Sequence, residues 1–458
     1  MKQSRKVLEA LLVIGLILII PLFFALKTKA NTPAVSNIPN TTVPVIPTAA
    51  NAPEEGNALQ PKQPPACTFP LAQITATEST PEQYTFSEPQ VVLTAPEGNI
   101  YNIAEWLPDN QQVLMTEDLR NVDVGNDKSI QQSINLYNPE TGEIKVIAFR
   151  DLTYEPPSWL SDLNAVVYPA ITYTSIDRKN GTSKFTRQVW LSYGNPDTAQ
   201  ILVDNLPQLL FAVKPGGSEM LYLSDNKISK VDKSLKKLTS SLFDPAQWDY
   251  GKGRRDKNPV SYNMAWQPGT SLVFLYSVAG GTANGGYTFI LDTNTGQICE
   301  LDMGGWAGRA RWSSDGHYLA IDRSTVYIGF TNSTDLVILD TITGNLHTAG
   351  IVSKEVEGKH YVSDFTWAPD NRHLLVLEDV PSTYDPYRIE TIHHELYLVD
   401  FMSDQSLQLF PEYKSFAANS DALWNNFAWS PNGSKLLIRC SANWVDRICF
   451  IAVQRTVQ

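Results

Sequence analysis

The sequence is poor in the residues and motifs on which many catalytic sites depend. Its 458 residues include only 4 cysteines and 6 histidines. No G-x-S-x-G occurs, which excludes the nucleophile elbow of an α/β-hydrolase. The Gly-rich stretch GGTANGG at 280–286 lacks the Lys-Ser/Thr of a phosphate-binding loop. We therefore expect no catalytic residue, no metal ligand and no cofactor.

Positive charge is also scarce. Lys and Arg number 36 against 48 Asp and Glu, a formal net charge of −12. Nucleic acids and anionic bilayers attract proteins through basic surfaces. The balance argues against such non-specific binding, and no nucleic-acid partner is expected. The densest basic cluster, GKGRRDKNP at 251–259, is typical of a solvated loop, with an anionic partner site as the alternative.

One long apolar run stands near the start of the chain. Residues 7–26, VLEALLVIGLILIIPLFFAL, would span about 30 Å as a helix, the thickness of a bilayer core. Three basic residues in 1–6 precede the run and two lysines follow it, which favours a cytoplasmic tail. The prediction is an uncleaved signal anchor in the cell membrane. A signal peptide cleaved after Ala30 is the alternative, and both place the folded part outside the cytoplasm.

Residues 27–83 differ from everything that follows them. They are rich in Pro, Thr, Asn and Ala and poor in large apolar residues. Such a composition cannot bury enough surface to offset the entropy of ordering it. We expect a disordered, extended extracytoplasmic linker between the anchor and the domain at 84–458.

A repeated unit fills that domain. FAWSPNGSKLLI at 427–438 has counterparts such as FTWAPDNRHLLV at 365–376 and ARWSSDGHYLAI at 310–321. Each has an aromatic residue that ends an apolar run, then a turn of the Pro-Asp-Gly type, then a second apolar run. A seventh copy has Val213 in place of the aromatic. The aromatics, which we interpret as structural blade-repeat residues, are Trp106, Trp159, Trp266, Trp312, Trp367 and Trp429.

The spacing of about 50 residues is typical of propeller blades. A third and a fourth run follow in each unit around a second turn, as in TFILDTNTGQICEL at 288–301. The last unit has only three runs, and EPQVVLTAPEG at 88–98 reads like the missing one. We predict an all-β, seven-bladed β-propeller of four-stranded antiparallel blades, closed by an N-terminal strand that completes the last blade.

The tandem W-x-P-D-G turns and D-x-x-T-G turns resemble those of the TolB-like β-propeller family over nearly all of 84–458. The resemblance implies a propeller that docks proteins or peptides. The sequence departs from the pattern at Val213, and only Asp315-Gly316 keeps Asp-Gly intact. TolB itself has a further N-terminal domain, where this chain has a linker and an apolar run. The resemblance therefore indicates the fold more strongly than a role.

Long loops are expected on one face of the ring. Residues 117–132, 170–187 and 379–394 would connect second to third strands, and 243–262, 351–363 and 411–425 would connect blades. Variable loops on a rigid scaffold usually carry binding, so we expect a ligand on that face near the central channel. The segment DLRNVDVGND at 118–127 is rich in side-chain oxygens, so calcium binding there is an open alternative. The HHE at 393–395 is a poor metal site, because adjacent residues of a strand point to opposite sides.

The four cysteines fall into two pairs. Cys440 and Cys449 lie on neighbouring strands of the last blade, where a cross-strand disulfide is geometrically plausible in an exported protein. Cys67 in the linker could reach Cys299 in an outer strand and tether the linker there. Free thiols are the alternative for both pairs.

Two functions are consistent with these observations. The first is a membrane-tethered, non-catalytic scaffold, a monomer that binds a protein, a peptide or an envelope polymer. The alternative is an enzyme centred on the channel, with a metal-dependent lactonase-like or a glycan-cleaving activity. That enzyme would need carboxylates or histidines from several blades to converge on the channel.

Overall fold

The computed structural model describes residues 65–72, 74 and 82–457, with gaps at 120–130, 152, 154, 178–181, 207–210, 218, 225–226, 233–236, 244–261, 278–287, 304–305, 325–333, 350–360, 386–387, 418–424 and 443–444. Contacts divide the chain into two units, Met1–Leu59 and Gln60–Gln458. The first unit and the expected anchor at 7–26 lie outside the described residues. Within the part that the structure describes, no helix is long and apolar enough to span a membrane.

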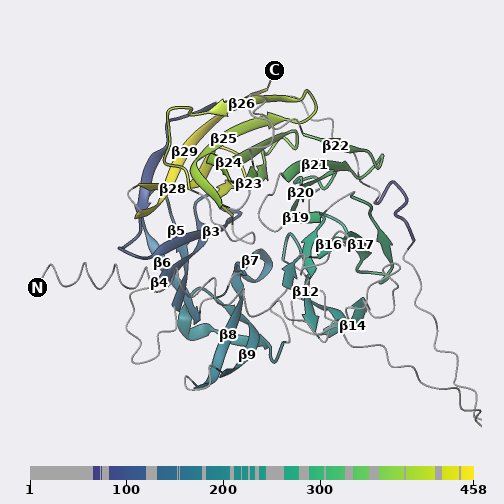
Figure 1. Cartoon of the computed structure of the whole chain (residues 1–458). Helices are drawn as coiled ribbons and strands as arrows, with labels where there is room; N and C mark the ends of the chain where they lie inside the picture. Colours follow the sequence, from purple (N-terminus) through teal and green to yellow (C-terminus); the bar gives the residue numbers. More distant parts are fainter. Residues whose placement is uncertain are drawn as a thin grey trace, which may run out of the picture. The chain divides into compact units, whose positions relative to one another are not determined.

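The described residues of the second unit form seven antiparallel sheets around a central axis (Figure 1). Blade 1 contains β3 (Ile100–Trp106), β4 (Val113–Leu119), β5 (Gln131–Tyr137) and β6 (Ile144–Asp151). Blade 2 contains β7 (Ser158–Leu160), β8 (Ala165–Asp177), β9 (Thr182–Ser192) and β10 (Gln200–Val203), with the 3-10 turns η1 (Ser161–Leu163) and η2 (Pro196–Thr198). Blade 3 contains β11 (Phe211–Val213), β12 (Glu219–Ser224), β13 (Lys227–Asp232) and β14 (Lys237–Phe243).

Blades 4 to 6 repeat this four-stranded plan. Blade 4 contains β15 (Tyr262–Trp266), β16 (Leu272–Ser277), β17 (Thr288–Asp292) and β18 (Ile298–Glu300). Blade 5 contains β19 (Trp306–Trp312), β20 (Tyr318–Ser324), β21 (Thr334–Asp340) and β22 (Leu346–Thr348). Blade 6 contains β23 (Tyr361–Trp367), β24 (His373–Asp385), β25 (Arg388–Asp400) and β26 (Gln405–Leu409). Blade 7 contains β27 (Phe427–Trp429), β28 (Lys435–Ala442) and β29 (Val445–Val457), with β1 (Glu82–Phe86) and β2 (Gln90–Thr94).

Apolar side chains pack between every pair of neighbouring blades. Seven buried clusters alternate with the seven sheets, including one between blades 7 and 1. Strand β21 shows why its sequence is apolar throughout: Leu336 and Ile338 pack toward blade 6, whereas Val337 and Leu339 pack toward blade 4. Successive strand residues face opposite sides, so both sides of a blade need apolar residues.

The predicted seven-bladed fold and its closure are confirmed. Strand β2 pairs with β29 through residues such as Val91 opposite Cys449, so an N-terminal strand completes blade 7. The closing strand is longer than predicted, because β1 pairs with the outer part of β29. Pro89 lies between β1 and β2, and proline cannot donate a backbone hydrogen bond to the ladder. The edge strand is therefore in two pieces.

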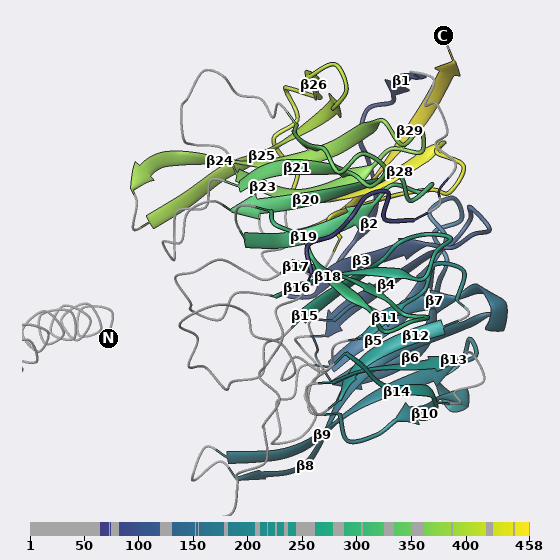
Figure 2. The same ribbon diagram turned by 90° about the vertical axis from the view of Figure 1, so that its right-hand side faces the viewer.

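Two segments expected as long loops are strands instead. Residues 170–187 lie mostly in β8 and β9, and 379–394 lie mostly in β24 and β25. Figure 2 shows both hairpins extending beyond the other strands on the same side of the ring. Their sequences, including AITYTSID and TSKFTRQVW, are rich in β-branched and aromatic residues, which favour strands. Much of 117–132, 243–262, 351–363 and 411–425 lies outside the described residues.

The expected linker is not a free tether along its whole length. Cys67 forms a disulfide with Cys299. The Cys67 backbone N–H donates to the Glu300 carbonyl at the end of β18, and the Glu300 N–H donates to the Pro65 carbonyl. Phe69 and Leu71 pack against the cluster between blades 4 and 5. These apolar residues within a Pro-rich segment are the reason that it binds the ring. Cys440 and Cys449 also form a disulfide, between β28 and β29.

The pairing of β2 with β29 leads to a prediction about how substitutions in β2 change the stability of the protein. Leu93 packs against the cluster between blades 7 and 1, whereas Val91 on the same strand is 47% exposed. We expect Leu93→Ala to destabilise the protein by about 1–2 kcal/mol and Val91→Ala by less than about 0.5 kcal/mol. Urea denaturation of both variants measures the difference. Equal shifts would show that packing of β2 does not contribute to closure.

Candidate functional site

The motif tryptophans lie on the innermost strands. Five of them end these strands: Trp106 ends β3, Trp266 ends β15, Trp312 ends β19, Trp367 ends β23 and Trp429 ends β27. Trp159 is the central residue of β7, and Val213 ends β11. The aromatic positions therefore surround the channel at the end of the ring where the first turn of each blade lies.

Three of these tryptophans join neighbouring blades by hydrogen bonds. The indole N–H of Trp106 donates to the Ala428 carbonyl at 2.8 Å, and that of Trp367 donates to the Arg311 carbonyl at 2.8 Å. Trp312 donates to the Ala265 carbonyl at 3.0 Å. Each acceptor precedes the tryptophan of the preceding blade. The bonds give these tryptophans a structural role.

Trp429 behaves differently from the other three. Its indole nitrogen is buried and has no hydrogen-bond partner among the described residues. Its ring lies 5.8 Å from Tyr84 and 6.2 Å from Phe86, both in the closing strand β1. The indole therefore packs against the closure of the ring.

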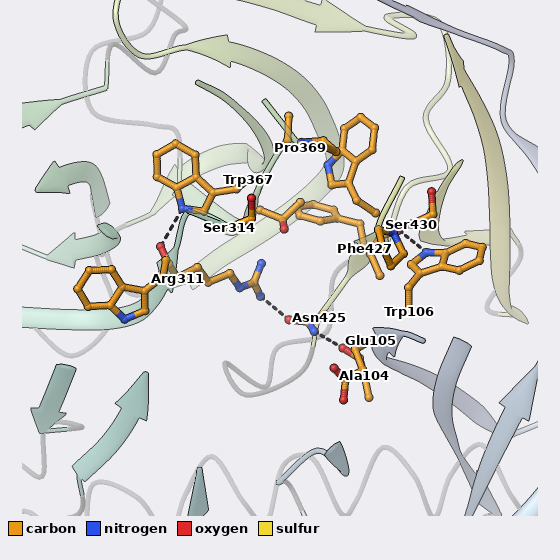
Figure 3. Close-up of a pocket in the computed structure, with 16 residues that line it drawn as sticks. Ala104, Glu105, Trp106, Arg311, Ser314, Trp367, Pro369, Asn425, Phe427 and Ser430 are labelled. Carbon is orange, nitrogen blue, oxygen red and sulfur yellow. Dashed lines mark hydrogen bonds between the residues drawn. The ribbon is translucent and has the colours of Figure 1, made fainter. Parts of the chain in front are cut away.

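A cavity of about 380 Å³ lies among these inner strands. Its walls come from blades 5, 6, 7 and 1 (Figure 3). The lining combines polar groups with five aromatic side chains, Trp106, Trp312, Trp367, Trp429 and Phe427. The turns that follow the inner strands contribute Ser314, Pro369 and Pro431. These turns lie at the opposite end of the inner strands from the face where we expected a ligand, whereas Asn425, which also lines the cavity, is the last residue of the expected connection at 411–425.

A polar chain crosses this cavity from blade 5 to blade 1 (Figure 3). The Arg311 guanidinium donates to Asn425 Oδ1 at 2.6 Å, and the Asn425 amide donates to the Ala104 carbonyl. Arg311 also forms an ion pair of 2.8 Å with Asp364, which is fully buried. Burial lowers the pKa of the Arg311 guanidinium, and the Asp364 carboxylate opposes that shift. Asp364 in turn accepts from the backbone N–H groups of Phe365 and Asn426.

Glu105 is the one acidic residue among the described residues of the cavity lining. It precedes Trp106, and its Oε1 accepts a hydrogen bond of 2.6 Å from the Trp159 backbone N–H in blade 2. Burial raises the pKa of this carboxyl to about 7, and the Trp159 N–H opposes the shift. A group of this kind changes charge near neutral pH. Glu105, Arg311 and Asp364 were not predicted, because their proximity depends on which blades are neighbours. Asn425 is the last residue of the connection at 411–425, which was expected on the binding face.

The histidine pair lies far along the blade 6 hairpin from this cavity. His393 Nε2 is 2.9 Å from Glu395 Oε1, whereas His394 Nδ1 is 2.6 Å from Asp379 Oδ1. They thus contact different partners, as expected for adjacent residues on a strand. No group of three or more His, Cys, Asp or Glu could hold a metal within the described ranges. The segments at 120–127 and 251–259 lie outside those ranges.

No family model and no curated protein matches this chain. Among solved structures, the chain is similar to TolB from Acinetobacter baumannii at 12% identity and a TM-score of 0.36, over 77% of this chain and 79% of that one. It is similar to a GH74 xyloglucanase from Xanthomonas campestris at 14% identity and a TM-score of 0.47, over 80% and 53%. A candidate 6-phosphogluconolactonase from Bacteroides fragilis is 15% identical with a TM-score of 0.43, over 75% and 92%.

These low identities and TM-scores carry no argument about function. The chain spans about half of the xyloglucanase and most of the other two. The propeller assignment rests on the seven sheets, the seven clusters between them and the pairing that closes blade 7.

The raised pKa of Glu105 gives a pH dependence of stability. The folded chain holds this proton more tightly than the unfolded chain, so stability falls as the pH rises from 4.5, the ordinary value, to about 7. Glu105→Gln keeps an acceptor for Trp159 and removes the titration. Between pH 4.5 and about 7, we expect the free energy of unfolding of the variant to fall by roughly 1–3 kcal/mol less than that of the natural protein.

Denaturation at pH 4.5, 6 and 8 measures this difference. Burial also raises the pKa of Glu378 to about 7. Glu378 is present in both proteins, so its contribution to the pH dependence cancels in the comparison. The exposed Glu412→Gln is the matched control and should leave the profile unchanged. Parallel profiles for the natural protein and Glu105→Gln would contradict the proposed burial of Glu105.

The buried ion pair gives a second prediction for this site. Asp364→Ala leaves Arg311 without its counter-charge and should destabilise the protein by about 3 kcal/mol or more. The control is Asp335→Ala. The Asp335 side chain is 43% exposed and pairs with Arg323, so its loss should lower the free energy of unfolding by under about 1 kcal/mol. Urea denaturation at pH 7 compares the two. Similar costs would mean that Arg311 is solvated rather than held by Asp364.

Proposed function

We propose that this chain is a membrane-tethered, extracytoplasmic propeller that binds a protein or peptide without catalysing a reaction. The observation that supports this proposal most strongly is the cavity, whose walls are fixed by strands from four blades. Its polar chain of Arg311, Asn425 and Ala104 is already bonded, so little ordering is needed when a ligand enters. Concave sites with apolar walls and a few placed polar groups are typical of binding sites.

The tether and the location are part of this proposal and rest on the sequence. The apolar run at 7–26 supports a membrane anchor with the propeller outside the cytoplasm. Two disulfides, Cys67–Cys299 and Cys440–Cys449, suit an oxidising compartment. The Cys67 disulfide would make the tether leave the ring from blade 4.

An enzyme centred on the channel is the second candidate, with lactonase-like or glycan-cleaving chemistry. Glu105 favours it, because a carboxyl with a pKa of about 7 suits proton transfer at neutral pH. Hydrolysis of glycosidic bonds generally requires two carboxyl groups. Within the described part of the lining, Glu105 is the single carboxyl group, and the buried Asp364 is paired with Arg311. The geometry therefore supports binding better than catalysis.

A variant that fills the cavity tests the proposal. Thr366 lines the cavity and is partly exposed, so Thr366→Trp should occupy the space where a ligand would sit. The control is Thr85→Trp, at an exposed threonine of β1. We expect the full-length natural protein and the control to retain a cross-linked partner in native membranes. In Thr366→Trp the yield of the cross-linked partner should fall at least about tenfold. Retention by a folded Thr366→Trp would place the partner elsewhere and overturn the use of this cavity.

A further inference from the structure

Among the described residues, the cavity lining has two ionisable groups, Arg311 and Glu105, and only Arg311 is paired with an opposite charge. Arg311 is matched by Asp364 at 2.8 Å. Glu105 accepts one backbone hydrogen bond through Oε1, and its side chain is partly exposed at the cavity. A carboxylate that is partly withdrawn from water is stabilised by an opposite charge or a donor that pairs with it.

The walls around Glu105 favour a cation over an anion. Four indoles and one phenyl ring line the same cavity. Aromatic rings attract cations through their negative faces. An entering anion would meet the Glu105 charge without an unpaired cation to receive it. A neutral ligand without a donor would give the Glu105 carboxylate no further partner.

We propose that the cavity binds an ammonium group, such as a lysine side chain or an N-terminal amine of a docked peptide, with Glu105 as its counter-ion. This inference rests on the proposed function and specifies the chemistry of its ligand. A volume of about 380 Å³ suits one long side chain or a small organic cation. Arg311 and Asn425 would then orient the carbonyl groups that accompany the amine.

Binding of this kind is linked to pH. The groups around Glu105 are the Trp159 N–H from blade 2 and, across the cavity, Arg311 from blade 5 with Asp364 from blade 6. The ammonium binds the ionised carboxyl. Because burial raises the pKa of Glu105 to about 7, affinity should rise as the pH passes from 6 to 8.

The experiment uses the full-length protein in detergent and three probes of similar size. They are N-acetyl-lysine methylamide, the same compound acetylated on its side chain, and hexanoate. Calorimetry and indole fluorescence report binding at pH 6 and pH 8. We expect only the ammonium probe to bind, at least about threefold more tightly at pH 8. Glu105→Gln should weaken it about tenfold and remove the pH dependence, while Glu412→Gln should change neither.

Four results would overturn the inference. They are equal binding of the acetylated probe, preference for hexanoate, unchanged affinity of the ammonium probe for Glu105→Gln, and the absence of any binding up to millimolar probe. These failures are separable from failure of the proposed function. If a cross-linked partner is still lost in Thr366→Trp, the cavity remains a docking site and only its ammonium specificity is wrong.

Discussion

The pairing of β1 and β2 with β29 is the constraint on which the rest of the structure depends. Six blades are each formed from one continuous stretch of chain, but blade 7 combines residues from both sides of the other six. This pairing brings Trp106 of blade 1 against Ala428 of blade 7, and it completes the cluster between these blades. A ring without it would expose an unpaired strand edge and an apolar blade face.

The cavity follows from this closure. Blades 7 and 1 are neighbours only because the ring is closed, and both contribute to the cavity with blades 5 and 6. Asn425 can bridge Arg311 and Ala104 because three blades are held at fixed positions around the channel. The same arrangement places Glu105 at the cavity, where its Oε1 accepts a hydrogen bond from the Trp159 N–H of blade 2. The rigidity of the ring thus gives the cavity its defined geometry.

The fold could be predicted because its signals are local and repeated. Turn residues and apolar runs at intervals of about 50 residues indicate blades, and the incomplete last unit indicates closure at 88–98. The cavity could not be predicted, because Glu105 and Arg311 lie about 200 residues apart and line the same cavity only through the order of the blades. A charged residue directly before a motif tryptophan was the available signal. The hairpins of blades 2 and 6 were missed because their length was interpreted as loop, although their composition favours strands.

The most direct test of the account is site-specific photo-cross-linking from within the cavity. A photoreactive amino acid would replace Thr366 in the full-length protein in its native membranes, with a second protein carrying it at Thr85 as the reference. The account predicts one covalent adduct with a partner protein or peptide from position 366 and none from position 85. Adducts from position 85 alone, or none from 366 while the protein is folded, would contradict the claim that the closed ring binds its partner in this cavity.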